Sequence, residues 1–190
     1  RRGDLPAERI ARMNAELGQR PLQGLAICCP FTPNPSRAPD RAAHLRRYAE
    51  FLQAVIARAR EQLPVRPTPS CTHLVGCSMG GAVAVDVARE SPGAYGSLSL
   101  VQSAHGAHRN PAIAEACRQL GPGAGPLPTL VLTSAGDPFR ERNQALAHAL
   151  DRASVPHTLE VLPGPHDQPW LREAGTPTLL MWLDRRPRAG

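Results

Sequence analysis

The chain has 190 residues, 42% of them hydrophobic and 20% charged, so it can bury the core of one domain and is too apolar for a disordered segment. Its formal charge of +6 comes from 22 basic residues that are all arginine and are scattered between few aromatic residues, which argues against a nucleic-acid-binding protein. No apolar run approaches the ~20 residues of a membrane span, and no stretch near Arg1 resembles a secretory signal.

The cysteines show no pattern of metal binding. They form no C-x-x-C pair, and their spacing from histidine does not fit a zinc site. Three of them fall in apolar runs, where a free thiol behaves as a small hydrophobic group. We therefore expect no metal and a reduced protein, which favours a cytoplasmic location. The cysteines are Cys28, Cys29, Cys71, Cys77 and Cys117.

The first half of the chain alternates helical and strand patterns. Its helices show apolar residues every three or four positions, as Ile10, Met13 and Leu17 do near the start. Residues 25–29 instead form a short continuous apolar run, typical of a strand that is covered on both faces. In order, this half predicts a helix over residues 5–17, a strand over 25–29, a helix between Asp40 and Pro64, a strand over 72–77 and a helix over 79–89.

The second half continues the same alternation, without an internal repeat. It predicts a strand over residues 97–101, a helix over 111–120, a strand over 129–133, a helix over 140–152, a strand over 158–162 and a last helix over 170–183, broken near Gly175. Strands that alternate with helices form a parallel sheet with helices on both faces. We therefore expect a single α/β domain over residues 1–190.

The motif G-x-S-x-G occurs once, as Gly76-Cys77-Ser78-Met79-Gly80, between a predicted strand and a predicted helix. This context is typical of a nucleophile elbow, a tight turn that lifts the serine hydroxyl clear of the sheet. We expect Gly76 and Gly80 to let the helix approach the strand, and the amide of Met79 to bind an oxyanion. The alternative is a tight strand-to-helix turn with a merely buried serine.

A nucleophilic serine needs a base, and the base needs an acid that orients it. Asp137 follows the predicted strand over residues 129–133, although capping the next helix would also explain it. His166 follows the last predicted strand in a loop shaped by proline and glycine. The order Ser78, Asp137, His166 is the chain order of the catalytic triad in α/β-hydrolases.

Three further residues are candidates for a substrate pocket: Phe31, His105 and Trp170. His105 follows the predicted strand over residues 97–101, where a structural role is the favoured alternative.

With these residues in place, the sequence resembles the esterase branch of the α/β-hydrolase superfamily, which includes S-formylglutathione hydrolases, feruloyl and acetyl-xylan esterases, enterochelin esterases and mycolyltransferases. The resemblance covers roughly residues 5–185. It implies that Ser78 is the nucleophile, Asp137 the acid and His166 the base. The matching pieces are residues 76–81, residues 136–139, and residues 164–167 with Trp170, which comes one position earlier than the family's tryptophan.

The chain departs from this family at the oxyanion loop, because it has no His-Gly-x-Gly-like segment after an early strand. Two explanations are open. The favoured one is a domain shortened at its N-terminus, which lacks the first strands and leaves an open place beside the strand over residues 72–77. In the other, residues 25–29 fill that place, and Phe31 or Thr32 supplies the second oxyanion amide.

We expect a serine esterase that acts on a small acyl ester through an acyl-enzyme on Ser78 and needs no metal or organic cofactor. An acyltransferase with the same triad and a non-catalytic binding domain of the same fold are the alternatives. The predicted open sheet edge would favour a homo-oligomer.

Overall fold

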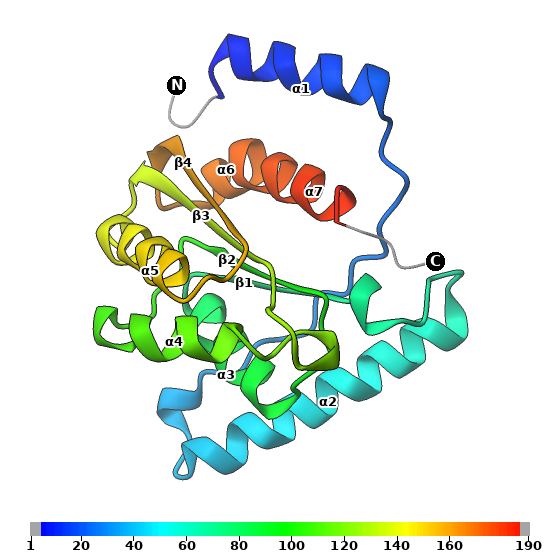
Figure 1. Cartoon of the computed structure of the whole chain (residues 1–190), viewed down its shortest axis with the longest axis vertical. Helices are drawn as coiled ribbons and strands as arrows, with labels where there is room; N and C mark the ends of the chain where they lie inside the picture. Colours follow the sequence, from blue (N-terminus) through cyan, green and yellow to red (C-terminus); the bar gives the residue numbers. More distant parts are fainter. Residues whose placement is uncertain (1–4, 187–190) are drawn as a thin grey trace.

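A parallel sheet of four strands forms the centre of the molecule. The computed structural model describes residues 5–186, and within them the strands lie in the order β1-β2-β3-β4 (Figure 1). Every pair of neighbours is parallel, so each connection crosses over to the adjacent position. The strands are β1 (His73–Cys77), β2 (Ser97–Val101), β3 (Thr129–Gly136) and β4 (His157–Pro165). The predicted α/β fold is confirmed.

Helices cover both faces of this sheet (Figure 1). One face carries α2 to α5, and the other carries α6 and α7, with α1 outside them. The helices are α1 (Ala7–Gln19), α2 (Arg41–Gln62), α3 (Met79–Glu90), α4 (Asn110–Cys117), α5 (Arg140–Arg152), α6 (Gln168–Trp170) and α7 (Thr176–Asp184). Among the described residues, no helix has the length and apolarity needed to cross a membrane.

Alternation along the strands divides the core into two clusters, one on each face. Leu98, Leu100 and Val131 pack against α2 to α5, whereas Leu130 and Leu132 pack against α6 and α7. Because successive side chains point to opposite faces, both faces of the two middle strands are buried. In β2 the face opposite Leu98 and Leu100 carries the buried serines Ser97 and Ser99.

Residues 25–29 do not form the predicted strand. They have no regular structure, and their side chains are exposed. The run has the composition of a buried strand, but it pairs with none of the four strands. The explanation in which these residues complete the sheet beside β1 is therefore wrong.

The C-terminal helix is also not broken as predicted. The backbone stays helical from α6 into α7 through a π-helical turn, Leu171–Gly175. Pro177 lies just after this turn. A proline in a helix offers no N–H and crowds the preceding turn, and the wider π-helical turn accommodates both effects without ending the helix.

β1 is an edge strand of the described sheet. The N–H of Ser78 donates to the carbonyl of Val101 in β2 (2.9 Å), so the backbone of Ser78 faces β2. Backbone groups alternate in direction along a strand, so those of Leu74 also face β2 and those of Val75 face the open edge. The side chain of Val75 is 41% exposed. An open position beside β1 is what the shortened-domain hypothesis predicted, and the missing strands themselves remain a prediction.

This alternation can be tested with proline. Val75→Pro removes an N–H that points to the open edge, so we expect it to cost less than about 1 kcal/mol of unfolding free energy. Leu74→Pro removes an N–H that points to β2 and leaves a buried acceptor unpaired, which costs at least about 1–3 kcal/mol. Urea denaturation of both variants measures the difference. Equal losses would contradict the assignment of β1 as an edge.

Candidate active site

The turn between β1 and α3 holds Ser78 in a strained conformation. Its φ is 52° and its ψ −119°, a region that residues with a side chain seldom enter. The close approach of α3 to β1 requires Gly76, where an added Cβ would lie 2.2 Å from the carbonyl oxygen of Gly80. Gly81 is equally constrained by Ser103, whereas a Cβ on Gly80 would meet open space. The prediction that Gly80 makes room for the helix is therefore wrong, and Gly81 has that role.

Ser78, His166 and Asp137 form the predicted chain of contacts at the carboxyl ends of the strands. Ser78 Oγ lies 3.1 Å from Nε2 of His166, and Nδ1 of His166 lies 2.9 Å from Oδ1 of Asp137. The carboxyl ends of parallel strands meet at one edge of a sheet, and β1, β3 and β4 each deliver one of these residues there. The sheet topology thus brings His166 together with Asp137, 29 positions away in the sequence, and with Ser78, 88 positions away.

The carboxylate of Asp137 is fully buried and held from three sides. Besides the imidazole, the hydroxyl of Thr133 donates to Oδ2 (2.6 Å) and the N–H of Phe139 donates to Oδ1 (2.9 Å). Three donors stabilise a buried negative charge and fix its orientation. Burial and the charge of Asp137 together raise the pKa of the neighbouring Cys77 thiol, so this cysteine stays protonated beside the site.

Phe139 packs against the imidazole, and Arg142 packs on the ring of Phe139. The ring of Phe139 meets that of His166 edge-on, with 5.4 Å between their centroids, and the Arg142 guanidinium lies 4.6 Å above the Phe139 ring. These contacts leave the side chain of His166 25% exposed. The ring is therefore restrained by packing and still open to water.

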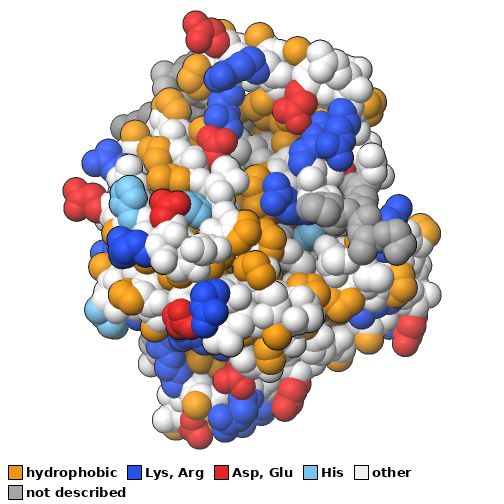
Figure 2. Space-filling view, in the orientation of Figure 1, with side chains coloured by type: hydrophobic (Ala, Val, Ile, Leu, Met, Phe, Trp, Pro, Cys, Tyr) orange, Lys and Arg blue, Asp and Glu red, His pale blue; other side chains and the backbone are white. Residues whose placement is uncertain are grey.

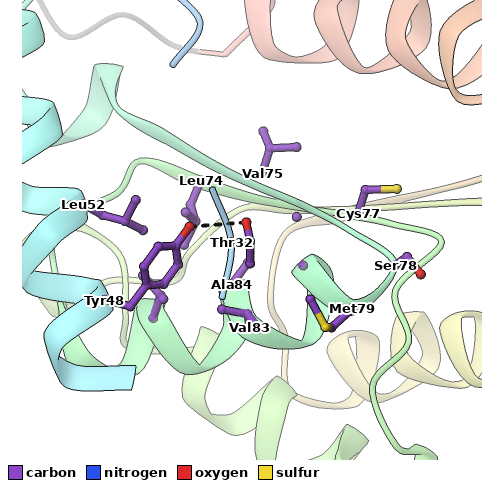
Figure 3. Close-up of a pocket in the computed structure, with 13 residues that line it drawn as sticks. Thr32, Tyr48, Leu52, Leu74, Val75, Cys77, Ser78, Met79, Val83 and Ala84 are labelled. Carbon is purple, nitrogen blue, oxygen red and sulfur yellow. Dashed lines mark hydrogen bonds between the residues drawn. The ribbon is translucent and has the colours of Figure 1, made fainter. Parts of the chain in front are cut away.

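A groove of about 340 Å³ begins at Ser78 and Met79 and follows the open edge of β1 (Figure 3). Its walls are apolar, with Tyr48 and Leu52 from α2 on one side and α3 on the other. The hydroxyls of Thr32 and Tyr48 are 3.3 Å apart at the far end. The space-filling view shows hydrophobic side chains near the middle of one face of the molecule and arginines dispersed around it (Figure 2). Arginine is not gathered into a basic surface on that face.

The three predicted pocket residues lie elsewhere. Phe31 is 87% exposed and does not line the groove, although its neighbour Thr32 does. Trp170 is fully buried against the second core cluster, and its indole N–H donates to the carbonyl of Pro163 (2.8 Å). An aromatic residue close to His166 in the sequence thus belongs to the core here.

His105 is buried and structural. Its Nδ1 contacts the hydroxyl of Ser103 and its Nε2 contacts Oδ1 of Asn110, both at 2.9 Å. The amide oxygen can only accept, so Nε2 carries the proton and Nδ1 accepts from Ser103. Burial lowers the pKa of His105, with the nearby Arg109 and Arg142 charges acting in the same direction. The favoured alternative in the sequence, a structural histidine, agrees with this geometry.

Sequence reasoning missed the residues that hold the triad in place, chiefly Thr133, Gln102 and Ser134. Thr133 binds Asp137, and Gln102 and Ser134 both contact the carbonyl of Pro165. The bonds of Gln102 and Ser134 to Pro165 join segments that lie far apart in the sequence, so no local pattern predicts them. The only available signal was position: all three residues lie at the carboxyl end of a strand.

Comparisons with known proteins support the fold. No family model and no curated protein matches the sequence. Two crystal structures of single-substitution variants of SOBER1 from Arabidopsis thaliana are similar, each with a TM-score of 0.57 and 17% identity over 97% of this chain and 95% or 94% of theirs. The S-formylglutathione hydrolase FrmB from Staphylococcus aureus has a TM-score of 0.58 and 17% identity over 76% of this chain and 64% of its own.

The chain has the α/β-hydrolase fold. This agrees with the fold that the sequence resemblance implied. An identity of 17% carries the likeness no further than the fold.

The close approach at the elbow predicts opposite outcomes for two glycines of one motif. Gly76→Ala forces a methyl group into the Gly80 carbonyl and should cost about 1–3 kcal/mol or more of unfolding free energy. Gly80→Ala adds its methyl group in open space and should cost less than about 0.5 kcal/mol. Chemical denaturation of the two variants checks this. A Gly80 variant that is as unstable as the Gly76 variant would show that the turn is built differently.

The lowered pKa of His105 predicts a loss of stability in acid. A folded-state pKa below the unfolded value of about 6.5 means that unfolding takes up a proton as the pH falls. The contribution is complete above about pH 6.5 and decreases below it. We expect the unfolding free energy of His105→Gln to depend less on pH between about 7.5 and 5 than that of the wild type. Parallel pH curves in urea melts would show that His105 does not titrate this way.

Proposed function

We propose that the protein is a serine hydrolase that cleaves a carboxylic ester through an acyl-enzyme on Ser78. The observation that carries the proposal is the continuous chain of contacts from Ser78 through His166 to the buried Asp137. A serine with a base within hydrogen-bond distance, itself oriented by a carboxylate, is the arrangement needed for nucleophilic catalysis. The similarity of the fold to S-formylglutathione hydrolase FrmB supports the same reaction class.

In the first half of the reaction, Ser78 Oγ attacks the carbonyl carbon of the ester and its proton passes to Nε2 of His166. The oxyanion accepts a hydrogen bond from the N–H of Met79, which is the first residue of α3 and has no acceptor in a preceding helical turn. The C–O bond to the alcohol then breaks, and the alkoxide takes the proton from His166. Ser78 is left acylated.

In the second half, water attacks the acyl carbon and gives its proton to His166. The bond to Ser78 Oγ breaks, the carboxylic acid leaves, and the proton returns to Ser78. Thr133 and Phe139 donate to the carboxylate of Asp137 in addition to the imidazole and hold it in place. Asp137 fixes the tautomer with the proton on Nδ1 and stabilises the imidazolium that forms in both halves.

The exposure of His166 favours hydrolysis over acyl transfer. Transfer to an alcohol requires that water be kept from the acyl-enzyme. The imidazole side chain is 25% exposed and therefore reachable by water. We propose water as the acceptor of the acyl group.

The nucleophile can be tested by two serine substitutions. Ser78→Ala should abolish hydrolysis of p-nitrophenyl acetate and labelling by a fluorophosphonate, since both need an activated hydroxyl. Ser99→Ala is the matched control. Ser99 is a buried serine in the neighbouring strand β2, and its Oγ has no hydrogen-bond partner among the described residues. We expect that control to label as fast as the wild type.

The burst of p-nitrophenol in the first turnover reports the acyl-enzyme. A wild-type protein that shows neither burst nor labelling would be a non-catalytic domain of the same fold. Labelling that survives Ser78→Ala would place the nucleophile at another residue.

A further inference from the structure

The carbonyl of Pro165, directly before His166, is bound by two buried side chains from neighbouring strands. Nε2 of Gln102 donates to it at 3.0 Å, and the hydroxyl of Ser134 donates to it at 2.9 Å. Nε2 of Gln102 also donates to Oγ of Ser134, at 2.8 Å. The three groups form a closed triangle in which each hydrogen atom has one acceptor, because an amide nitrogen supplies two and a hydroxyl one.

These bonds act on the main chain of His166. The carbonyl of Pro165 and the N–H of His166 belong to one planar peptide unit, so fixing the carbonyl fixes the plane from which the His166 Cα leaves. Gly164, the residue before Pro165, has a φ of 120°, a conformation open almost only to glycine. The chain before Pro165 therefore does not set the plane of the Pro165–His166 peptide by ordinary strand geometry. Asp137 holds the imidazole at Nδ1, and the triangle holds the main chain directly before His166.

The backbone of Gln102 has a positive φ. Gln102 follows β2 directly, has a φ of 46° and is 1% exposed. Glycine or asparagine is the usual residue in this conformation, and a buried glutamine is retained there against a conformational cost. Its N–H still donates to the carbonyl of Leu132 in β3, so the turn stays attached to the sheet while the side chain crosses towards β4.

We propose that Gln102 is a positioning residue for the reaction, which sets the distance between Ser78 and His166 by binding the Pro165 carbonyl, with Ser134 as its partner. The proposal rests on the function proposed above. It assigns Gln102 no contact with the substrate. Its effect is confined to the placement of the imidazole, so it should change turnover more than substrate binding.

The test uses variants that separate the side chain from the backbone. Gln102→Met keeps the length of the side chain and removes both donors. Gln102→Gly removes the side chain and relieves the left-handed backbone. We expect kcat for p-nitrophenyl acetate and the rate of fluorophosphonate labelling to fall ~10- to 100-fold in both, with KM within about threefold, because a small misplacement of a catalytic group has an effect of this size. Ser134→Ala should lower kcat in the same direction.

Gln53→Met is the matched control. Gln53 lies in α2, and its Nε2 donates to the buried hydroxyl of Tyr95 (3.1 Å), far from the triad in the fold. The substitution also removes an amide donor and leaves a buried group unpaired, so it should lower stability and leave kcat within about twofold of the wild type. If Gln102→Met and Gln53→Met lose activity equally, the loss follows stability, and the positioning role is wrong.

A second measurement does not depend on turnover. The proton on Nδ1 of His166, hydrogen-bonded to Asp137, can be followed by proton NMR and assigned by its loss in Asp137→Asn. We expect this proton to exchange with water at least ~10-fold faster in Gln102→Met than in the wild type or Gln53→Met, since a looser imidazole opens its hydrogen bond more often. Unchanged exchange in Gln102→Met would overturn the inference even if the wild type hydrolyses esters. An inactive wild type whose proton is protected through Gln102 would overturn the hydrolase proposal and leave the positioning role standing.

Discussion

The strained turn at Ser78 is the constraint on which the site depends. A serine with a positive φ, such as Ser78, is stable only if its surroundings hold the backbone in that conformation. Gly76 allows α3 to approach β1, and Gly81 allows it to approach Ser103 after β2. The carbonyl of Ser78 accepts from the N–H of Gly81 (3.0 Å) and from that of Ala104 (2.9 Å). The second bond ties the turn to the chain that leaves β2. The turn at Ser78 is therefore held by β1, β2 and α3 together, and they fix the backbone that carries the hydroxyl.

The parallel sheet places Asp137 and His166 at the same edge as Ser78. The order of four adjacent parallel strands places the ends of β1, β3 and β4 at one edge. Only the side chains remain to be oriented. Thr133 and Phe139 orient Asp137, and Gln102 and Ser134 bind the chain before His166. The left-handed backbones of Ser78 and Gln102, at the ends of neighbouring strands, are the two points of strain in this support.

The sequence predicted the parts of this arrangement that local pattern and chain order determine. The buried strands, most helix limits and the order Ser78, Asp137, His166 all follow from periodicity and from one motif. The strand over residues 25–29 was predicted wrongly. An apolar run favours burial in a sheet, but it does not show that a strand is present to pair with it. Phe31 and Trp170 were misplaced for a related reason: their positions depend on contacts between distant elements, which no single segment encodes. Gln102 was missed because nothing in its neighbourhood marks a left-handed backbone.

The open edge of β1 shows how little the triad depends on that side of the sheet. Ser78 is held from β2 and α3, and Asp137 and His166 are held by β2, β3 and the turn after β3. None of these hydrogen bonds crosses the edge at which Val75 is 41% exposed. The groove along this edge reaches Ser78 and Met79. Completion of the sheet at β1 should therefore change the surroundings of these two residues, while the alignment of Ser78, His166 and Asp137 is already set by the four strands present.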